Sequence, residues 1–185
     1  TPRSSSAASD VYKRQLTANT TAEYNTAVGT TSLNKNTTGS YNSAFGSFSL
    51  YDNTTGAYNS AIGYLSLQNN TTGQFNTALG INTLNNITTG SSNTSIGYST
   101  SASSSAAINQ TVIGFQADGQ ADNSVVLGNS DVTAIYMAED SGATIYAGNA
   151  TFNGDVVIQS DARLKSNIVS LGSTLHKLLQ IDGKS

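Results

Sequence analysis

Seven regularly spaced glycines constrain the fold of this chain more than any other feature. They lie at positions 29, 46, 63, 80, 97, 114 and 128, so five successive steps are 17 residues long and the last is 14. Each glycine closes a similar phrase, such as Asn53-Thr-Thr-Gly-Ala-Tyr-Asn-Ser-Ala-Ile-Gly63. A register held this long indicates a repeat architecture, in which each unit packs mainly on its two neighbours.

The order of residue types within one unit predicts a β-solenoid. A polar Asn-Thr-Thr-Gly turn precedes a short apolar run and the closing glycine, and a leucine follows four residues later at positions 33, 50, 67 and 84. We expect two short β-rich segments per unit, separated by turns. The turn glycines 39, 56, 73 and 90 are expected to supply positive φ. A helical repeat would need a longer period and fewer helix breakers.

Stacked coils would have a thin core. The expected stack places Phe45, Ile62 and Leu79 above one another about 4.8 Å apart, with asparagine and threonine ladders at the corners. Each unit has only about three apolar side chains, many of them alanine, and both ends of the stack would expose sheet edges. Association of several identical chains would cover these surfaces, and we infer a homotrimer.

The aromatic side chains at positions 24, 41, 58 and 75 share one place in the repeat. Aromatic residues at repeat spacing are expected to form a buried stack. The alternative is an exposed ladder on which glycans could stack.

The repeat resembles those of two families. The unit Asn-Thr-Ala-Val-Gly…Ser-Leu…Asn-Thr-Thr-Gly is similar to repeats in the head domains of trimeric autotransporter adhesins, and more closely to repeats in phage and bacterial tail fibre domain proteins. The final, shorter step ending Asn123-Ser-Val-Val-Leu-Gly128 looks most like the adhesin form, a parallel β-roll packed as a trimer. This resemblance covers residues 19 to about 130 and implies an all-β, trimeric fibre.

Composition sets limits on partners. Between residues 19 and 130 only five side chains are charged, namely Glu23, Lys35, Asp52, Asp118 and Asp122, and the whole chain has a net charge of −3. We therefore expect no binding of nucleic acid. Cysteine is absent, which excludes disulfides and thiolate metal sites. No cofactor, no metal and no membrane insertion are expected in this chain.

Composition also divides the chain into four parts. Residues 1–15 share nothing with the repeat and resemble translated adaptor sequence. Residues 16–130 are predicted to form the solenoid, and a Ser/Ala-rich segment at 99–107 marks a transition within it. Residues 131–159 are predicted to form a β-hairpin neck, with strands at 131–138 and 143–147 and a hairpin at 150–158. In residues 160–185, leucines and isoleucines at helical spacing predict a short α-helical segment over 161–181.

The start of this last part resembles a second family. The phrase Gln159-Ser-Asp-Ala-Arg-Leu-Lys-Ser-Asn-Ile168 is similar to the opening of the intramolecular chaperone domain of endosialidase-type tail spikes and many tail fibres. That domain assembles the trimer and then cuts itself off. The resemblance implies Ser160 as nucleophile and Lys165 as general base, with cleavage at or beside Ser160, near Asp161. Positions 160–185 correspond only to the opening of a longer domain.

The proposed serine–lysine chemistry imposes a geometric condition. Lysine acts as a base only if burial lowers its pKa from about 10.4 toward neutrality. Five residues on one helix rotate about 500°, so Ser160 must precede the helix or Lys165 must come from a neighbouring chain. The alternative is an ordinary helix start, capped by Ser160 and Asp161, with Lys165 in solvent. His176, the only histidine, is expected to be exposed.

Three functions follow as hypotheses. The first is the structural, receptor-binding shaft of a phage tail fibre in the virion, with a self-cleaving chaperone and a host cell-surface receptor such as a glycan. The second is the head of a bacterial trimeric adhesin at the cell surface. The third, a separate enzyme acting on glycans, would need paired carboxylates, and acidic residues are sparse in the repeats. The only catalysis expected is the autoproteolysis assigned to Ser160 and Lys165.

Overall fold

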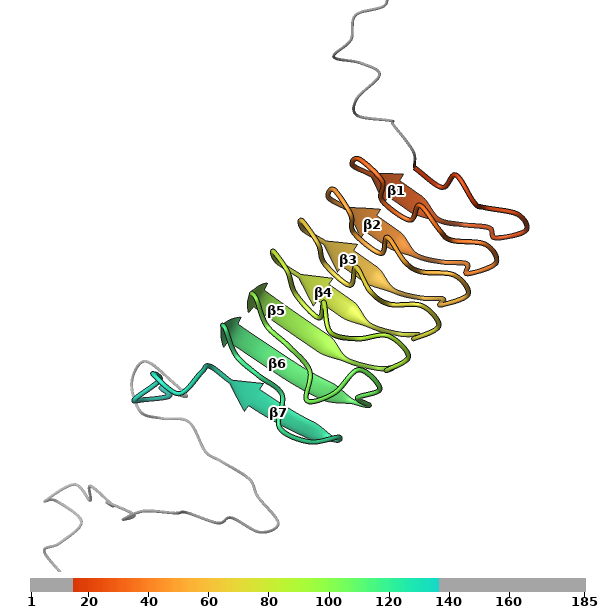
Figure 1. The fold of residues 1–185 in the computed structure, drawn as a ribbon. Coiled ribbons are helices and arrows are strands. Elements are labelled where there is room, and N and C mark those ends of the chain that lie inside the picture. Colours follow the sequence, from red (N-terminus) through yellow and green to blue (C-terminus); the bar gives the residue numbers. More distant parts are fainter. Residues whose placement is uncertain (1–14, 137–185) are drawn as a thin grey trace, which may run out of the picture. The chain divides into compact units, whose positions relative to one another are not determined.

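A computed structural model describes residues 15–136 of the chain. They form an all-β solenoid of seven parallel strands and about six turns, without a helix. The strands are β1 (Thr26–Val28), β2 (Ser43–Phe45), β3 (Ser60–Ile62), β4 (Thr77–Leu79), β5 (Thr94–Tyr98), β6 (Gln110–Phe115) and β7 (Ser124–Leu127). They follow one another in a single sheet, one strand per coil (Figure 1). The predicted all-β class, the parallel solenoid and its repeat are confirmed for these residues.

The register of the sheet repeats the period of the sequence. Ala44 pairs with Ala61 and Ala61 with Ala78, so each strand residue pairs with its counterpart in the next repeat unit. The same step joins Gly97 to Gly114, so the Ser/Ala-rich segment 99–107 does not interrupt the stack. Between β6 and β7 the pairing follows the shorter last step of the sequence, from Gln110 to Ser124. Identical coils therefore place identical residues directly above one another.

Only one of the two predicted β segments per coil is a strand. The leucine segment instead runs through turns in which the leucine itself has positive φ, as at Leu50 (48°) and Leu67 (48°). Its backbone still joins the stack, since the N–H of Leu67 donates to the oxygen of Thr83 over 3.0 Å. A left-handed residue turns the chain sharply and directs the leucine side chain inward, and the hydrogen bonds between coils offset its conformational cost.

The turn glycines have a role other than the predicted one. Positive φ occurs two residues later, at Tyr41 (62°) and Tyr58 (58°), and at the closing glycines. Gly39 is required because its backbone lies close to the next coil. A Cβ there would overlap the carbonyl oxygen of Gly56 and lie 2.7 Å from Oδ1 of Asn36.

The core is as thin as the sequence predicts. Each regular coil contributes one leucine and one alanine to it, both fully buried or nearly so: Leu33, Leu50, Leu67, Leu84, Ala44, Ala61 and Ala78. Phe45, Ile62 and Leu79 stack in register as expected, but they lie on the outer face of the sheet and are 41–45% exposed. Strand alternation explains the difference, because the neighbouring alanine occupies the inward position.

Two buried asparagine ladders replace the missing apolar core. In the first (Asn25, Asn42, Asn59, Asn76, Asn93), each Oδ1 accepts the backbone N–H of the equivalent residue in the next coil, over 2.8–3.1 Å. Each Nδ2 donates to a turn carbonyl of the next coil. Buried amides need such partners, so the ladders tie each coil to the next.

The second ladder (Asn36, Asn53, Asn70) lies inside the Asn-Thr-Thr-Gly turns. Nδ2 of Asn53 donates to Oδ1 of Asn36 over 2.7 Å, and Asn70 repeats the contact with Asn53 over 2.8 Å. The next position is Ile87, and Oδ1 of Asn70 is the buried side-chain atom without a hydrogen-bond partner among the described residues. The predicted corner ladders are thus confirmed, and the isoleucine ends this one.

The structure describes only residues 131–136 of the predicted neck, and the strand predicted at 131–138 does not form in them. Residues 132–136 form no strand, and residues 131–136 are exposed. Their alternating pattern resembles a strand, but no adjacent segment of the described chain pairs with it. The strands predicted at 143–147 and 150–158, the helix over 161–181, and residues 1–14 lie outside the described residues.

Candidate association surface

The outer face of the sheet carries three columns of outward-pointing side chains. We call the residue before each closing glycine the strand column: Val28, Phe45, Ile62, Leu79, Ile96, Ile113 and Leu127. The residue after the glycine forms the distal column: Thr30, Ser47, Tyr64, Ile81, Tyr98 and Phe115. The residue five before the glycine forms the corner column: Tyr24, Tyr41, Tyr58, Phe75, Ser92 and Asn109.

Strand geometry places the first two columns side by side. In β5, Ile96 and Tyr98 are exposed on either side of Gly97, as Ile113 and Phe115 are in β6. Residues two apart in a strand share a face. The closing glycines of coils two to six have nearly the same φ, from 131° to 143°, so Tyr64 and Ile81 follow the same path in their own coils.

The corner column is a stack of rings at the entry to the strands. Tyr24, Tyr41, Tyr58 and Phe75 follow one another with ring centroids 4.9, 4.9 and 5.1 Å apart and planes within 16° of parallel. The prediction of burial is wrong for the single chain, in which these rings are 49–70% exposed. Positive φ at each of them turns the side chain away from the core.

The stacking geometry also affects whether glycans could stack on the corner column, which was the alternative function considered for these rings. A sugar ring stacks on the face of an aromatic ring, and neighbouring rings of this column cover one another's faces. The column therefore offers mainly ring edges and tyrosine hydroxyls along its length. Such a surface fits the apolar side chains of a protein better than the face of a sugar.

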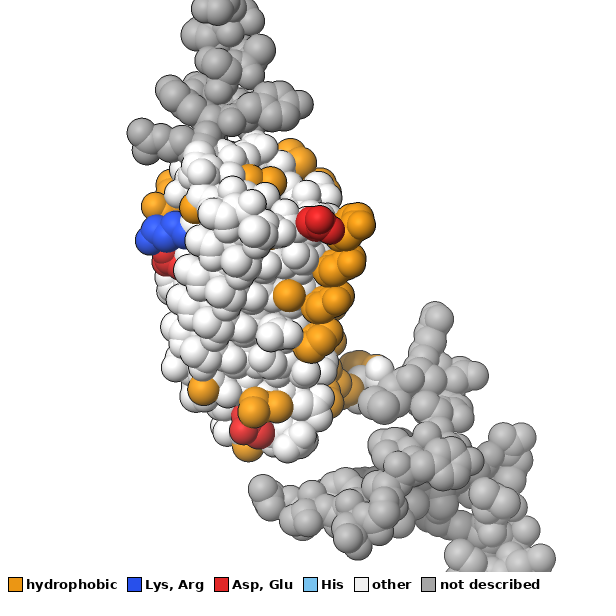
Figure 2. Space-filling model, turned by 90° about the vertical axis from the view of Figure 1, so that its right-hand side faces the viewer, with side chains coloured by type: hydrophobic (Ala, Val, Ile, Leu, Met, Phe, Trp, Pro, Cys, Tyr) orange, Lys and Arg blue, Asp and Glu red, His pale blue; other side chains and the backbone are white. Residues whose placement is uncertain are grey.

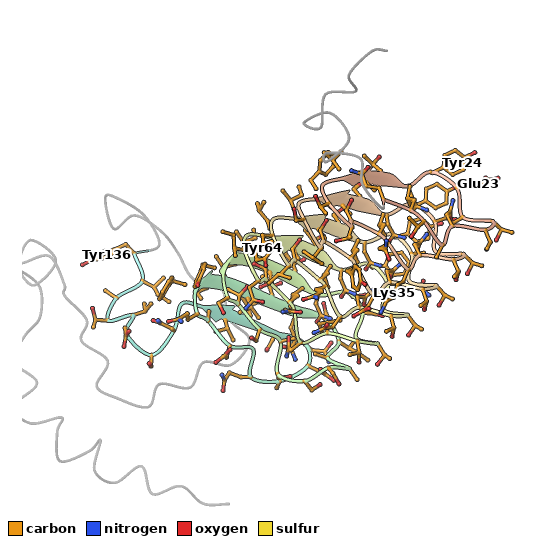
Figure 3. The ribbon with its side chains drawn as sticks, turned by 45° about the horizontal axis from the view of Figure 1, so that its top comes forward. Glu23, Tyr24, Lys35, Tyr64 and Tyr136 are labelled. Carbon is orange, nitrogen blue, oxygen red and sulfur yellow. The ribbon has the colours of Figure 1, made fainter. Side chains whose placement is uncertain are left out.

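The outer face is free of charge over most of its length. Glu23 adjoins the corner column in the first coil. Asp122 has the same place in the last coil, where its Oδ1 accepts the N–H of Ile108 beside the corner column. No other charged residue lies next to a column residue in the sequence from Thr26 to Phe115. Figure 2 shows a mostly polar side with a hydrophobic stripe along its edge. In Figure 3 Tyr24 and Tyr64 lie toward opposite ends of the strands, with Lys35 away from both.

Lys35 and Asp52 form an ion pair between two neighbouring coils. Nζ of Lys35 lies 2.6 Å from Oδ1 of Asp52 and 4.9 Å from the centroid of the Tyr51 ring. The hydrogen bond to Asp52, and then its charge, raise the pKa of Lys35. Because the lysine is exposed, the pair contributes little to stability, although it favours the native register of these coils.

The described residues offer little for catalysis. An open pocket at the last coil has a single carboxylate, Asp118, in its lining among these residues. Residues 15–136 contain no group of three or more His, Cys, Asp or Glu that could hold a metal, and no helix long and apolar enough to cross a membrane. Ser160, Asp161, Lys165 and His176 lie outside the described residues, so their predicted roles stay predictions.

The sequence pointed only partly to this surface. The aromatic repeat and the row of Phe45, Ile62 and Leu79 were visible in it, but the distal column was not singled out. Its signal is the residue after each glycine, which changes from Thr30 and Ser47 to a large apolar side chain from Tyr64 onward. Comparisons of the chain with protein-family models, curated proteins and solved structures gave no match.

Proposed function

We propose that this chain forms the shaft of a homotrimeric tail fibre, followed by the start of a self-cleaving intramolecular chaperone that assembles the trimer. The observation that carries the proposal is the continuous, nearly uncharged apolar face along the whole solenoid. Contiguous apolar faces of this kind mark association surfaces in folded proteins. Receptor binding at a host cell surface belongs to the same proposal.

The composition of the core supports association. One leucine and one alanine per coil bury far less apolar surface than a globular core does, and much of the larger apolar material lies outside. Full burial of an isoleucine or phenylalanine contributes on the order of 1.5–3 kcal/mol, and covering the 37–45% of each strand-column side chain that is exposed contributes roughly 0.5–1.3 kcal/mol of this. The strand column alone offers seven such positions, so side-by-side packing would add substantially to the stability of each chain.

The phrase from Ser160 to Ile168 favours a tail fibre over a bacterial adhesin. It resembles the opening of a tail-fibre chaperone, whereas an adhesin would continue toward a membrane anchor. The sequence downstream of Ser185 would distinguish the two, since a chaperone domain indicates the fibre and a membrane-anchoring β-barrel indicates the adhesin.

Polar substitutions in the strand column test the proposed association. The double variant Ile62→Ser/Ile96→Ser is expected to sediment mainly as single chains at concentrations where the parent chain sediments as trimers, because two central apolar contacts are lost from each copy. The matched control, Thr55→Ser/Thr72→Ser, changes exposed positions in the turns and should sediment like the parent. Equal sedimentation of all three proteins would contradict association through this face.

Ser160→Ala tests the processing half of the proposal. In a chain extended through its natural downstream sequence, we expect the parent to release a C-terminal fragment and the variant to remain intact, since alanine has no nucleophile. Gel electrophoresis with intact-mass measurement would detect the fragment. Ser166→Ala, which alters a serine outside the predicted dyad, is the control. Release of the same fragment by Ser160→Ala would remove Ser160 from the mechanism.

A further inference from the structure

We infer that neighbouring copies join edge to edge, with the corner column of one copy packed against the distal column of the next copy at the same coil level. This inference rests on the proposed homotrimer and adds to it the surface and register of the contact. The partner that covers this face is a second copy of this chain.

The distribution of large side chains along the two edges carries the argument. In the corner column they occupy the first four coils, from Tyr24 to Phe75, and Ser92 and Asn109 follow. In the distal column the first two positions are Thr30 and Ser47, and the large side chains occupy the last four coils. Neither edge alone is apolar along its whole length.

Joining one edge to the other gives a continuous seam. A large side chain meets a small one in coils one, two, five and six, as with Tyr41 against Ser47 and Ser92 against Tyr98. In coil three Tyr58 meets Tyr64, an aromatic pair of the kind that stabilises packing. In coil four Phe75 meets the aliphatic side chain of Ile81. Every level of the seam then contains at least one large apolar side chain.

The two edges cannot meet within one chain. Corner and distal residues of one coil are six residues apart on an extended path, which separates them by about 20 Å. A closed ring of three instead brings different edges of neighbouring copies together, because a cyclic interface with more than two subunits pairs two different patches. The threefold axis runs along the solenoid and keeps equal coils level.

The size and charge of the face suit a second copy. Six strand spacings of about 4.8 Å and a width of about 20 Å give roughly 600 Å² of sheet face. A standard interface buries about 800 Å² on each partner. In a ring of three this face is shared between two neighbours, so the association depends on the closure of the whole ring. Identical faces bring like charges near one another only at the two ends of the stack, where Glu23 and Asp122 lie.

Disulfide cross-linking tests the pairing directly, because the chain has no cysteine of its own. In the full 185-residue chain, Tyr41→Cys/Ser47→Cys should form covalent dimers and trimers on mild oxidation, seen on a non-reducing gel. Each single variant should remain at the mass of one chain. A disulfide within one chain is excluded, since its Cα atoms must lie within about 7 Å.

A second pair of cysteines keeps the test valid if the first double variant does not fold. Ser92→Cys/Tyr98→Cys places the cysteines on the same two edges in the fifth coil, where the native small residue is already in the corner column. The third variant, Tyr41→Cys/Ser92→Cys, reports an antiparallel arrangement, in which corner columns of two copies would face each other. We expect cross-links in the first two pairs and none in the third.

The outcomes separate this inference from the proposed function. Sedimentation of the same samples under reducing conditions gives their assembly state. Trimers that cross-link through neither edge pair, or that cross-link only through Tyr41→Cys/Ser92→Cys, would overturn the edge pairing and leave the homotrimer standing. A parent chain that sediments as a monomer would overturn both.

Discussion

Gly63→Ala is expected to destabilise the solenoid by about 2–6 kcal/mol, a large part of the stability of a typical domain. Gly63 has a φ of 131°, which side-chain-bearing residues rarely adopt. A Cβ at this position would overlap the carbonyl oxygen of Gly80 and lie 2.6 Å from its carbonyl carbon. Backbone strain costs about 1–3 kcal/mol and overpacking about as much again.

The steric conflict in Gly63→Ala cannot be relieved locally. The opposing atoms are backbone of the next coil, and Gly63 N–H donates to Phe45 of the preceding coil over 2.7 Å. Movement of Gly63 would therefore disturb both neighbours. Chemical denaturation followed by circular dichroism measures the loss of stability. The control is Thr55→Ala, at an exposed position in the Asn-Thr-Thr-Gly segment of the same coil. Equal denaturation midpoints for the two variants would show that position 63 does not require glycine for its positive φ and its close approach to the next coil.

Asn59→Leu is expected to lower the free energy of unfolding by about 2–6 kcal/mol although it adds apolar volume to the interior, because one buried N–H left unsatisfied costs about 1–3 kcal/mol and each of the two other lost hydrogen bonds about 0.5–1.5 kcal/mol. The side chain of Asn59 is fully buried and has three partners. Its Oδ1 accepts the N–H of Asn76 over 3.0 Å, and its Nδ2 donates to the oxygen of Gly73 over 2.9 Å and to Oδ1 of Asn42 over 3.1 Å. Leucine leaves the N–H of Asn76 without its acceptor, whereas the oxygen of Gly73 keeps the bond from Nδ2 of Asn70 and Oδ1 of Asn42 keeps the bond from the backbone N–H of residue 59.

The same substitution at an exposed asparagine is the matched control for Asn59→Leu. Asn69 also bonds to a neighbouring coil, through Nδ2 to the backbone and side-chain oxygens of Asn85, but it is exposed to water. Asn69→Leu should therefore change the free energy of unfolding by about 0.5 kcal/mol or less. Denaturant midpoints of comparable size for the two variants would mean that the buried ladder is not a main source of stability.

The period of the sequence was sufficient to predict the stack. Equal spacing of the closing glycines implies equal coils, equal coils place like residues in register, and Asn36 and Asn53 at one position of adjacent coils then form a ladder. These inferences need only the repeat length and the geometry of parallel pairing. The thin core followed from counting apolar residues in each unit.

The local backbone could not be predicted in the same way. Positive φ falls on Tyr58 and Leu67, residue types that rarely adopt it, while the turn glycine does not show it. Intrinsic preference favours glycine there, but contacts between coils decide, because each corner must donate and accept hydrogen bonds in step with its neighbours. The exposure of Tyr41 follows from its corner conformation, and without that conformation burial was the natural expectation for a stacked ring.

The molar mass of the parent chain in solution tests the central claim most directly, namely that the apolar face of the solenoid is covered by identical copies. Sedimentation equilibrium of the intact 19.1 kDa chain is expected to give three times the mass of one chain at micromolar concentration. A folded protein that keeps the mass of one chain as the concentration rises would contradict the claim and the fibre assignment that depends on it.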